Sequence, residues 1–379
     1  IIKKNERGAK GDMKTKAAVV YEHKAPVVVE DLNLADPKEN EVLIRMGASG
    51  VCHSDWSVVT GTIYYDPPVV LGHEGAGVIE AVGEGVDYVK PGDHAILSFV
   101  TYCGGCRMCQ ADQVVLCEGF PVRLGFLLDD TCRLSNQAGQ QIPQMARIGT
   151  MSEYAVVPEQ SLIKINPDYP LDKAALVGCG VTTGVGAVIN TAQVQPGGWV
   201  AVIGVGGVGL NAVQGAKLAG AERIFAIDLV ERKLEFATVF GATDLINASQ
   251  VDPVEVIQDL TDGKGVDYAF EVIGNPETIR LAYQIIRRAG MAVVIGITSP
   301  SAQIEIPAQD LVRTEKRLVG SFYGSTVPRV DMLRLLNWYD QGKIKLDELI
   351  TQTYTLDQIN RAFYDLNAGR NARGMILYS

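Results

Sequence analysis

The sequence lacks the features of a nucleic-acid-binding or membrane protein. Its 379 residues carry 34 Lys and Arg against 44 Asp and Glu, so there is no excess of basic side chains to neutralise phosphates. No apolar run continues for about 20 residues, the length of a membrane-spanning helix, before a charged residue or a glycine interrupts it. We therefore expect a protein that acts on small molecules, with no nucleic-acid partner and no membrane partner.

The N-terminus lacks the apolar core of a secretory signal. Residues 1–12, IIKKNERGAKGD, are polar, and we interpret them as a tail, with the fold starting near Met13. This pattern predicts a cytoplasmic protein. Because thiols stay reduced in that compartment, clustered cysteines there bind metal more often than they form disulfides.

Four of the seven cysteines form the most specific local pattern. Two residues separate each of the first three, and seven residues precede the fourth, within the segment 98–118: Cys103, Cys106, Cys109 and Cys117. Four thiolates can close a tetrahedral shell around Zn²⁺, which leaves no position for substrate and predicts a structural zinc. An iron–sulfur cluster and a set of unrelated reduced cysteines are the alternatives.

Three further metal-ligand candidates lie far apart in glycine-rich contexts: Cys52 in GVCHSDWS, His73 in LGHEGAG and Cys179 in VGCGVTTG. A Cys, His, Cys set leaves a fourth zinc position open, as a catalytic zinc requires. Asp55 is the candidate carboxylate to orient the histidine, and Glu74 is a second companion carboxylate. Taken singly, each cysteine or histidine is more often a core residue. We assign no role to Cys132.

A glycine motif in the middle of the chain predicts a nucleotide site. WVAVI (199–203) is typical of a buried strand, and GVGGVG (204–209) and a helical pattern follow it. Gly204 suits the tight turn, Gly206 allows a pyrophosphate to approach, and Gly209 allows close packing of helix and strand. An ordinary glycine-rich turn is the alternative.

A second strand, RIFAI, ends at Asp228, about 20 residues beyond the motif. Its carboxylate can accept hydrogen bonds from ribose hydroxyls and would repel a 2′-phosphate, which favours NAD over NADP. Arg232 and Lys233 follow directly and could receive that phosphate instead, so the preference between NAD and NADP stays open at this point.

The pattern of elements predicts an α/β protein of two domains, with one long domain as the alternative. VDYAFEVIG, a helical stretch PETIRLAYQIIRRAG and MAVVIGI extend a parallel, doubly wound sheet. Before the motif, EVLIRMGASG, AGVIEAVGEGV and PGDHAILSF indicate a β-rich domain. We predict a first part over 13–179, a nucleotide-binding domain over 180–323, and a return of 324–379 to the first domain.

The order of these motifs resembles that of the zinc-containing medium-chain dehydrogenases. GHEGAGVIEAVGEGV, the four cysteines and GVGGVG carry the resemblance, which extends from about Met13 to the C-terminus. It implies a GroES-like catalytic domain, a Rossmann coenzyme domain with an active-site cleft between the two, and one catalytic and one structural zinc. It also implies an NAD-dependent enzyme that moves hydride between an alcohol and the nicotinamide ring, with zinc as the Lewis acid.

The resemblance also implies roles for individual residues. Ser54 would pass the alcohol proton away from zinc, Thr183 and Val208 would press on the nicotinamide, and His53 and Arg373 would contact the pyrophosphate. Ser57 departs from the family pattern, because many members carry a histidine at this outer end of the proton relay. The last relay step could therefore run through water. The cofactor contacts expected overall are Gly204, Gly206, Gly207, Val208, Gly209, Asp228, Lys233, Thr183, His53 and Arg373.

Subfamily and substrate follow less directly. The long loop between Cys117 and Ser152 resembles that of dimeric members, so we expect a homodimer. The positions that line the alcohol pocket in relatives are Ile63, Tyr65, Phe99 and Phe322, which suggest an apolar slot for medium, allylic or aromatic primary alcohols.

Three other interpretations remain at this stage. Tyr65 could equally belong to the ordinary core. A thiol-adduct formaldehyde dehydrogenase is the competing function, and Arg123 keeps a thiol cofactor open. A member that has lost catalysis is a third alternative.

Overall fold

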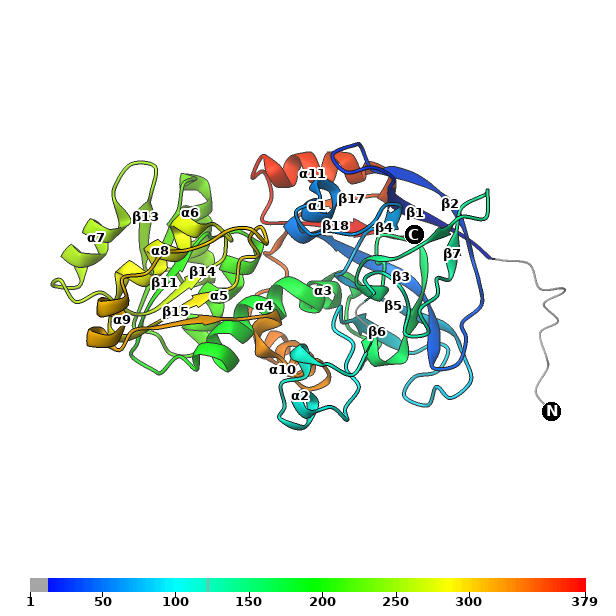
Figure 1. The fold of residues 1–379 in the computed structure, drawn as a ribbon, viewed down its shortest axis with the longest axis horizontal. Helices are drawn as coiled ribbons and strands as arrows, with labels where there is room; N and C mark the ends of the chain where they lie inside the picture. The colour runs from blue at the N-terminus through cyan, green and yellow to red at the C-terminus, as the bar shows by residue number, and fades with distance from the viewer. Residues whose placement is uncertain (1–12, 121–122) are drawn as a thin grey trace.

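The computed structural model describes residues 13–120 and 123–379, so the predicted tail at 1–12 lies outside the described residues. Figure 1 shows two parts side by side: a parallel sheet flanked by helices, and a β-rich part in which the C-terminus ends. A helical run that includes α3 and α4 lies between them. The predicted α/β architecture is confirmed.

Two sheets build the β-rich part. The first has the strand order β4-β1-β2-β7-β8, and the second has the order β10-β6-β5-β3-β18-β17, with β9 also paired to β3. Their bounds are β1 Met13–Val20, β2 Val28–Leu34, β3 Glu41–Val51, β4 Val69–Val70, β5 Gly75–Val82, β6 His94–Leu97, β7 Leu134–Ser135, β8 Gln141–Ile142, β9 Tyr154–Pro158, β10 Leu162–Ile165, β17 Ile350–Tyr354 and β18 Arg373–Leu377.

The central strand β3 explains how this part closes. Apolar side chains alternate along its first half and face one core, as in a strand with one buried face. The last strand of the chain, β18, pairs antiparallel with β3, so that Gly374 lies opposite Val51. Residues after 324 therefore return to the sheet that the first part of the chain begins.

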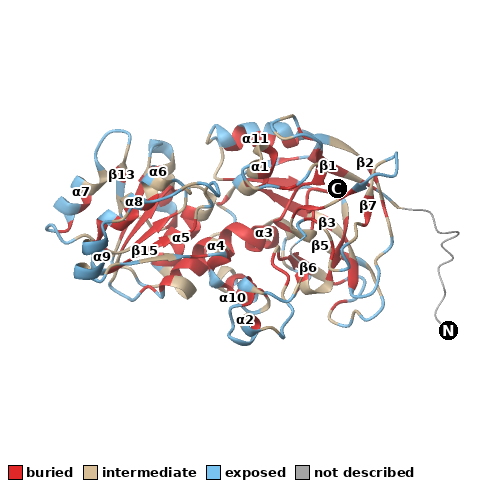
Figure 2. Cartoon of the chain, viewed as in Figure 1, coloured by how far each residue is buried: buried red, intermediate tan, exposed pale blue. Residues whose placement is uncertain are grey.

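The other part contains a six-stranded sheet among the described residues, in the order β13-β12-β11-β14-β15-β16 and parallel throughout. Its central strands are buried on both faces by helices, as Figure 2 shows, and therefore consist of continuous apolar runs. The elements are β11 Trp199–Ile203, α5 Gly207–Leu218, β12 Arg223–Asp228, α6 Glu231–Phe240, β13 Asp244–Asn247, α7 Pro253–Leu260, β14 Val266–Glu271, α8 Pro276–Ile285, β15 Ile286–Val294, α9 Ala308–Thr314 and β16 Arg317–Gly320.

One predicted helix is shorter than expected. The helical pattern covers 276–290, but α8 ends at Ile285 and β15 begins at the next residue. Ala289 has a left-handed backbone (φ 58°), which a helix cannot include. Ile286 instead pairs with Val266 of β14, so the segment joins the parallel sheet, and Arg287 Nε lies 2.6 Å from the Asp267 carboxylate.

A continuous helical run, 171–192, connects the two parts. It consists of α3 Leu171–Leu176, a π turn η4 Val177–Val181, α4 Thr182–Gly186 and a second π segment η5 Ala187–Ala192. Among the described residues its length and composition alone would suffice to cross a membrane, because its glycines do not interrupt the helix. Burial of 78% of the tested window identifies it as a core helix. The predicted boundary at 179/180 falls inside this run.

The remaining elements complete the chain: α1 His53–Thr60, α2 Arg107–Gln110, η1 Val114–Leu116, η2 Met145–Arg147, η3 Glu159–Ser161, η6 Tyr323–Ser325, α10 Pro328–Asp340, η7 Leu356–Gln358 and α11 Ile359–Asn367.

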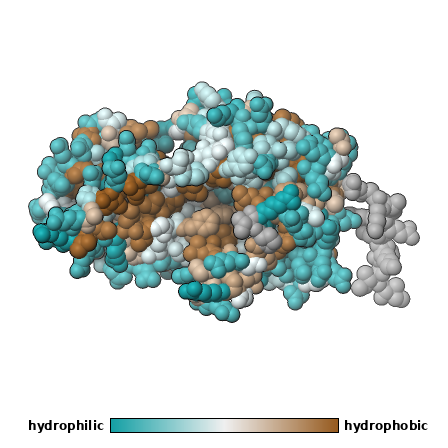
Figure 3. All heavy atoms as spheres, in the orientation of Figure 1, coloured by the Kyte–Doolittle hydropathy of each residue, from teal (hydrophilic) through white to brown (hydrophobic). Residues whose placement is uncertain are grey.

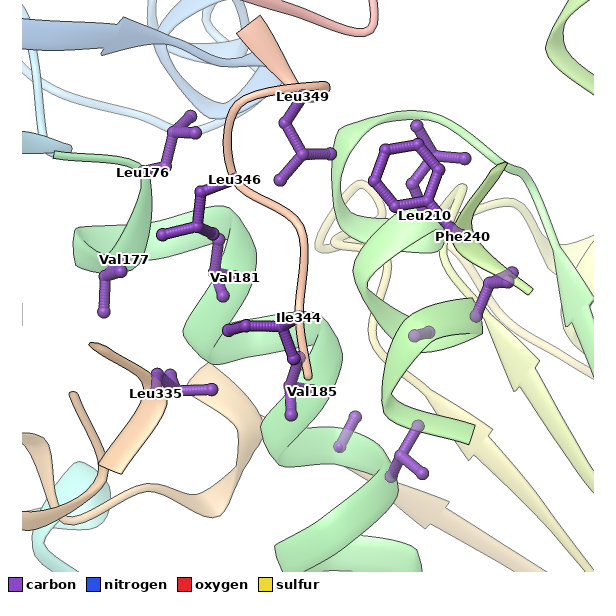
Figure 4. Packing of buried hydrophobic residues seen from close by; sticks show 14 of the residues in the cluster. Leu176, Val177, Val181, Val185, Leu210, Phe240, Leu335, Ile344, Leu346 and Leu349 are labelled. Atoms are coloured by element: carbon purple, nitrogen blue, oxygen red, sulfur yellow. The ribbon is translucent and has the colours of Figure 1, made fainter. Parts of the chain in front are cut away.

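One hydrophobic cluster spans both parts of the molecule. It includes Ile163 of β10 and Val202 of β11. Figure 4 shows how side chains of the helical run, such as Val181 and Val185, pack near Ile344 and Leu346 from the segment after α10. The two parts therefore share a core around this helix.

This shared core yields a stability prediction. Leu335→Ala, on the buried face of α10 (3% exposed), should lower the free energy of unfolding by about 2–5 kcal/mol, because it removes buried methyl groups and leaves a cavity. Leu333→Ala on the same helix (41% exposed) is the matched control and should change it by no more than about 0.5 kcal/mol. Urea unfolding measures both, and equal losses would contradict the packing described here.

Candidate functional site

Cys52, His73, Glu74 and Cys179 meet at one buried point. Their sulfur, nitrogen and carboxylate oxygen atoms all lie within 4.8 Å of one another. Cys52 is the residue that precedes α1, His73 and Glu74 stand directly before β5, and Cys179 lies in the π turn η4. The structure thus brings together residues that lie as many as 127 positions apart in the sequence.

Asp55 fixes the orientation of His73. Its Oδ1 lies 2.9 Å from His73 Nδ1, and its Oδ2 accepts a hydrogen bond from the Cys52 backbone N–H at 3.1 Å. Nδ1 therefore carries the proton, and Nε2 keeps its lone pair. Nε2 is buried and makes no hydrogen bond to any described residue. A metal ion is the partner that such a nitrogen fits.

A buried ion pair adjoins the four groups. The Arg373 guanidinium donates to Oε2 of Glu74, while Oε1 of Glu74 has no hydrogen-bond partner among the described residues. The pKa of the Cys52 thiol lies well below its ordinary value, chiefly because Cys179 hydrogen-bonds to its sulfur, with His73 and Arg373 adding to the effect against desolvation. A thiolate is the form that binds zinc.

The four clustered cysteines gather in a separate lobe next to α2. The sulfur atoms of Cys103, Cys106, Cys109 and Cys117 lie within 4.8 Å of one another. Backbone N–H groups of Gly105 and Cys106 point at Cys103 Sγ at 3.4 and 3.3 Å. Backbone hydrogen bonds lower the pKa of Cys106 to about 6, so a thiolate forms there near neutral pH. This set fits a tetrahedral metal ion.

The glycine turn lies at the end of β11 and the start of α5. A Cβ at Gly209 would lie 1.9 Å from the carbonyl oxygen of Gly204, so only glycine allows this contact between helix and strand. A Cβ at Gly206 would meet no atom within 4 Å, so this position faces open space. A Cβ at Gly207 would lie 2.3 Å from Cδ of Arg373, which places Arg373 between Glu74 and the turn.

Asp228 ends β12 beside this turn. Its Oδ2 accepts a hydrogen bond from the Val205 N–H at 3.0 Å, and its Oδ1 accepts from the N–H groups of Leu229 and Val230 at 2.8 and 3.1 Å. These bonds hold a negative charge at the edge of the glycine turn.

Basic residues lie near the turn and near one another. His53 begins α1 and is exposed, and desolvation together with the nearby charges of Arg373 and Lys233 lowers its pKa. Thr183 is half-buried on α4, which packs on the first turn of α5 that contains Val208. Arg373 therefore lies against the turn as a cation suited to bind phosphate, whereas the lowered pKa of His53 favours its neutral form.

Comparison with known proteins identifies this combination. Residues 38–167 match the family model for the alcohol dehydrogenase GroES-like domain, and residues 207–340 match that for zinc-binding dehydrogenases. The chain is 39% identical over 371 residues to the NDMA-dependent alcohol dehydrogenase of Amycolatopsis methanolica, covering 97% of this chain and 100% of that protein. It is 38% identical over 380 residues to alcohol dehydrogenase class-3 of Cereibacter sphaeroides, with the same coverage. This chain belongs to the zinc-dependent medium-chain alcohol dehydrogenase family.

Solved structures agree with this assignment. The benzyl alcohol dehydrogenase of Acinetobacter calcoaceticus matches with a TM-score of 0.89 and 32% identity, covering 97% of this chain and 100% of that one. An alcohol dehydrogenase zinc-binding domain protein from Burkholderia ambifaria matches with a TM-score of 0.91, the same identity and the same coverage. The chain is therefore an alcohol oxidoreductase that uses zinc and a nucleotide cofactor on small-molecule alcohols.

The pocket residues predicted for this dehydrogenase divide into two groups. The ring of Phe99 lies edge-on to His73 with centroids 5.7 Å apart, and Phe322 lies 6.1 Å from Phe99 and is 46% exposed. Tyr65, in contrast, is buried in the β-rich core, where its hydroxyl accepts a hydrogen bond from the Ala146 N–H at 3.1 Å. Ile63 packs partly buried against the same cluster. The contacts of Tyr65 favour the core-packing alternative.

Two features of the dehydrogenase site were not expected from the sequence. The first is the ion pair of Arg373 with Glu74, since the expected contact of Arg373 was the pyrophosphate. The second is Tyr323, whose ring lies 3.9 Å from that of Phe99. The ion pair joins positions 299 residues apart, so no local spacing could reveal it. For Tyr323, the one local feature of the sequence that could have drawn attention is the neighbouring Gly324, which indicates a turn.

The orientation of His73 by Asp55 yields a second prediction. Asp55→Asn removes the charge that fixes the ring, so zinc should bind at this point about 10–100-fold more weakly. Metal analysis after dialysis against graded chelator measures the loss. Asp244→Asn, which disrupts an ion pair with Arg223 in the coenzyme part, is the control and should leave zinc binding unchanged. Unaltered zinc retention in Asp55→Asn would refute the role of Asp55.

Proposed function

We propose that this protein is an NAD-dependent alcohol dehydrogenase that reversibly oxidises medium, allylic or aromatic primary alcohols to aldehydes. The observation that carries the proposal is the meeting of Cys52, His73 and Cys179 at one buried point beside Phe99, with Arg373 linking that point to the glycine turn. A metal bound at this buried point and a nucleotide bound at the glycine turn would both contact the alcohol substrate.

The proposal includes two zinc ions per chain. Cys52, His73 and Cys179 would hold one, because two thiolates and a free imidazole nitrogen form a donor set that zinc prefers. The four cysteines of the lobe would hold the other and stiffen the loop. When bound at the first set, zinc supplies Lewis acidity at the substrate oxygen.

Residues of the chain itself provide the remaining chemistry. Ser54, whose Oγ lies 3.8 Å from Cys52 Sγ, would receive the alcohol proton. Thr183 and Val208 would press the nicotinamide toward the substrate from the junction of α4 and α5. His53, Lys233 and Arg373 would bind the pyrophosphate. Since Ser57 replaces a histidine common in the family, the proton would leave through water.

The preference for NAD rests on Asp228. Three backbone N–H groups hold its carboxylate in place, so its charge cannot swing away from a 2′-phosphate. Arg232, the nearby cation, is oriented by a hydrogen bond from its guanidinium to the Gly369 carbonyl oxygen at 2.6 Å. Ribose hydroxyls would be favoured over a phosphate at this position.

The aromatic walls favour apolar alcohols over charged thiol adducts. Phe99 and Phe322 meet at 70°, the edge-to-face geometry that also accommodates an aromatic substrate ring. The solved benzyl alcohol dehydrogenase with the same fold supports this choice. Arg123, the residue that kept a thiol cofactor open, already pairs with Asp130 at 3.3 Å and stacks on Phe126.

A homodimer would cover the free edge of the coenzyme sheet. β16 pairs only with β15 among the described strands, so its other edge presents backbone donors and acceptors. Apolar side chains are exposed near it, including Ile297 (58%), Leu311 (40%) and Val312 (77%). Figure 3 shows apolar surface over this part of the molecule. A second copy that continues the sheet would bury both features.

The activity itself is the third prediction. Benzyl, allylic and linear primary alcohols with NAD should yield NADH, with the highest kcat/KM for the aromatic and allylic members. Cys52→Ala should reduce turnover at least 1,000-fold, on the order of 4 kcal/mol of lost transition-state stabilisation. Absorbance of NADH at each substrate concentration measures both, and chelation should mimic the variant.

Parallel assays distinguish the competing functions. Activity only with formaldehyde plus a low-molecular-weight thiol would replace the proposed substrate class with thiol adducts. Because one relative is named as NDMA-dependent, the panel is repeated with NDMA, and turnover only in its presence would overturn the proposal that exchangeable NAD carries the hydride away. No turnover in any arm would favour a non-catalytic member.

Coenzyme choice provides the fourth prediction. Asp228→Asn removes the negative charge and leaves one acceptor oxygen for the backbone N–H groups where the carboxylate offers two, so the ratio of kcat/KM for NAD to that for NADP should fall about 10–100-fold, the effect of one charge-assisted hydrogen bond and one repulsion. The KM for alcohol should stay unchanged, which controls for damage to the fold. An unaltered ratio would show that Asp228 does not select the coenzyme.

A further inference from the structure

A strained turn, η6, follows β16, the last strand of the six-stranded parallel sheet, which we call the coenzyme sheet. The turn lies close to the metal point, the place where Cys52, His73 and Cys179 meet. In η6, three consecutive residues have left-handed backbones: Tyr323 (φ 52°), Gly324 (φ 65°) and Ser325 (φ 48°). A left-handed backbone is unfavourable for a bulky aromatic residue. Such a conformation persists only where surrounding contacts hold it, and it is concentrated at functional sites.

Several of the contacts that hold the turn come from the helical run 171–192. Asn190 Nδ2 donates to the Gly324 carbonyl oxygen at 3.2 Å, and the Thr191 hydroxyl lies 2.8 Å from the Ser325 hydroxyl. Gly324 lies against Gly186 so closely that a Cβ at Gly186 would lie 2.6 Å from the Gly324 oxygen. The turn is therefore clamped on the helix that carries Cys179.

Tyr323 connects this turn to both sides of the metal point. Its hydroxyl donates to the carbonyl oxygen of Gly178, the residue before Cys179, within the π turn η4. The centroid of its ring lies 3.9 Å from that of Phe99, and the Phe99 ring lies edge-on to His73. Tyr323 itself is 2% exposed, so water does not compete for these contacts.

The π turn explains why such support matters. A π turn is wider than an α-helical turn, occurs mostly as a single-turn bulge inside an α-helix, and is frequent at functional sites. Here it sets the direction of the Cys179 side chain. A hydrogen bond from outside the helix to the carbonyl directly before Cys179 restricts how far this turn can relax.

We propose that Tyr323 is a positioning residue. Its hydroxyl holds the π turn that contains Cys179, and its ring holds Phe99, one wall of the proposed substrate pocket. The inference rests on the proposed zinc at Cys52, His73 and Cys179. Tyr323 follows the last strand of the coenzyme sheet. The inference therefore implies that the geometry of Cys179, the third metal ligand, depends on a residue of the coenzyme part.

Tyr323→Phe tests the hydroxyl alone, because the ring and its packing remain. We expect zinc to leave the Cys52, His73 and Cys179 set about 10-fold faster in the presence of chelator, the lower end of the effect of removing a group that supports a ligand. Release from the four-cysteine lobe should keep its rate. In the cobalt-substituted protein, the visible ligand-field bands should shift, since they report ligand angles directly and need no turnover.

Tyr283→Phe is the matched control. It removes another buried tyrosine hydroxyl, which donates to Asp310 at 3.0 Å in the coenzyme part. Faster release and a shifted spectrum in Tyr323→Phe, with neither change in Tyr283→Phe, would support the inference. Unchanged release and spectrum in Tyr323→Phe, or equal changes in both variants, would overturn it.

A second variant and the zinc content of the unmodified protein complete the test. If Tyr323→Phe does not fold, Thr191→Val loosens the same turn through its bonds to Ser321 and Ser325 and carries the test with the same outcomes. If the unmodified protein holds zinc only in the four-cysteine lobe, the proposed function fails at its metal site. That result is distinct from a zinc that binds and is indifferent to Tyr323.

Discussion

The structure depends on the burial of two thiols, an imidazole and a carboxylate within 4.8 Å of one another. Ionisable groups removed from water are unfavourable unless opposite charge and hydrogen bonds compensate them. Arg373 compensates Glu74, but Nε2 of His73 and Oε1 of Glu74 remain without hydrogen bonds to described residues. A divalent cation held by the two sulfurs and Nε2 satisfies this arrangement, and the surrounding architecture serves to hold the ligands in place.

The helical run 171–192 links that point to the nucleotide site. It carries Cys179 in a π turn and Thr183 one turn later, and it packs on α5, the helix that begins in the glycine turn. Arg373 makes a second connection, from the ion pair with Glu74 to the backbone of Gly207. Metal geometry and coenzyme geometry are therefore mechanically linked, which suits a reaction in which hydride passes between groups bound at the two positions.

The sequence predicts features that are encoded locally. The strands over 199–203 and 223–228, the glycine turn and the parallel sheet are present as expected, because periodicity and spacing determine them. Long-range contacts could not be predicted in this way. At the end of α8, Ile286 pairs with Val266 of β14, and Tyr65 packs in the β-rich core with its hydroxyl bonded to the Ala146 N–H. The π turn η4 includes the buried Gly178 and Gly180, which the sequence alone would suggest as interruptions of a helix.

The most direct test of the account is the number of zinc ions in the unmodified protein. Metal analysis per chain should find two, and Cys179→Ser should retain the one in the four-cysteine lobe while losing the other. Two zinc ions that fall to one in this variant would place the second at the buried point where Cys52, His73 and Cys179 meet. A single zinc in the unmodified protein, or two that Cys179→Ser leaves in place, would contradict the account.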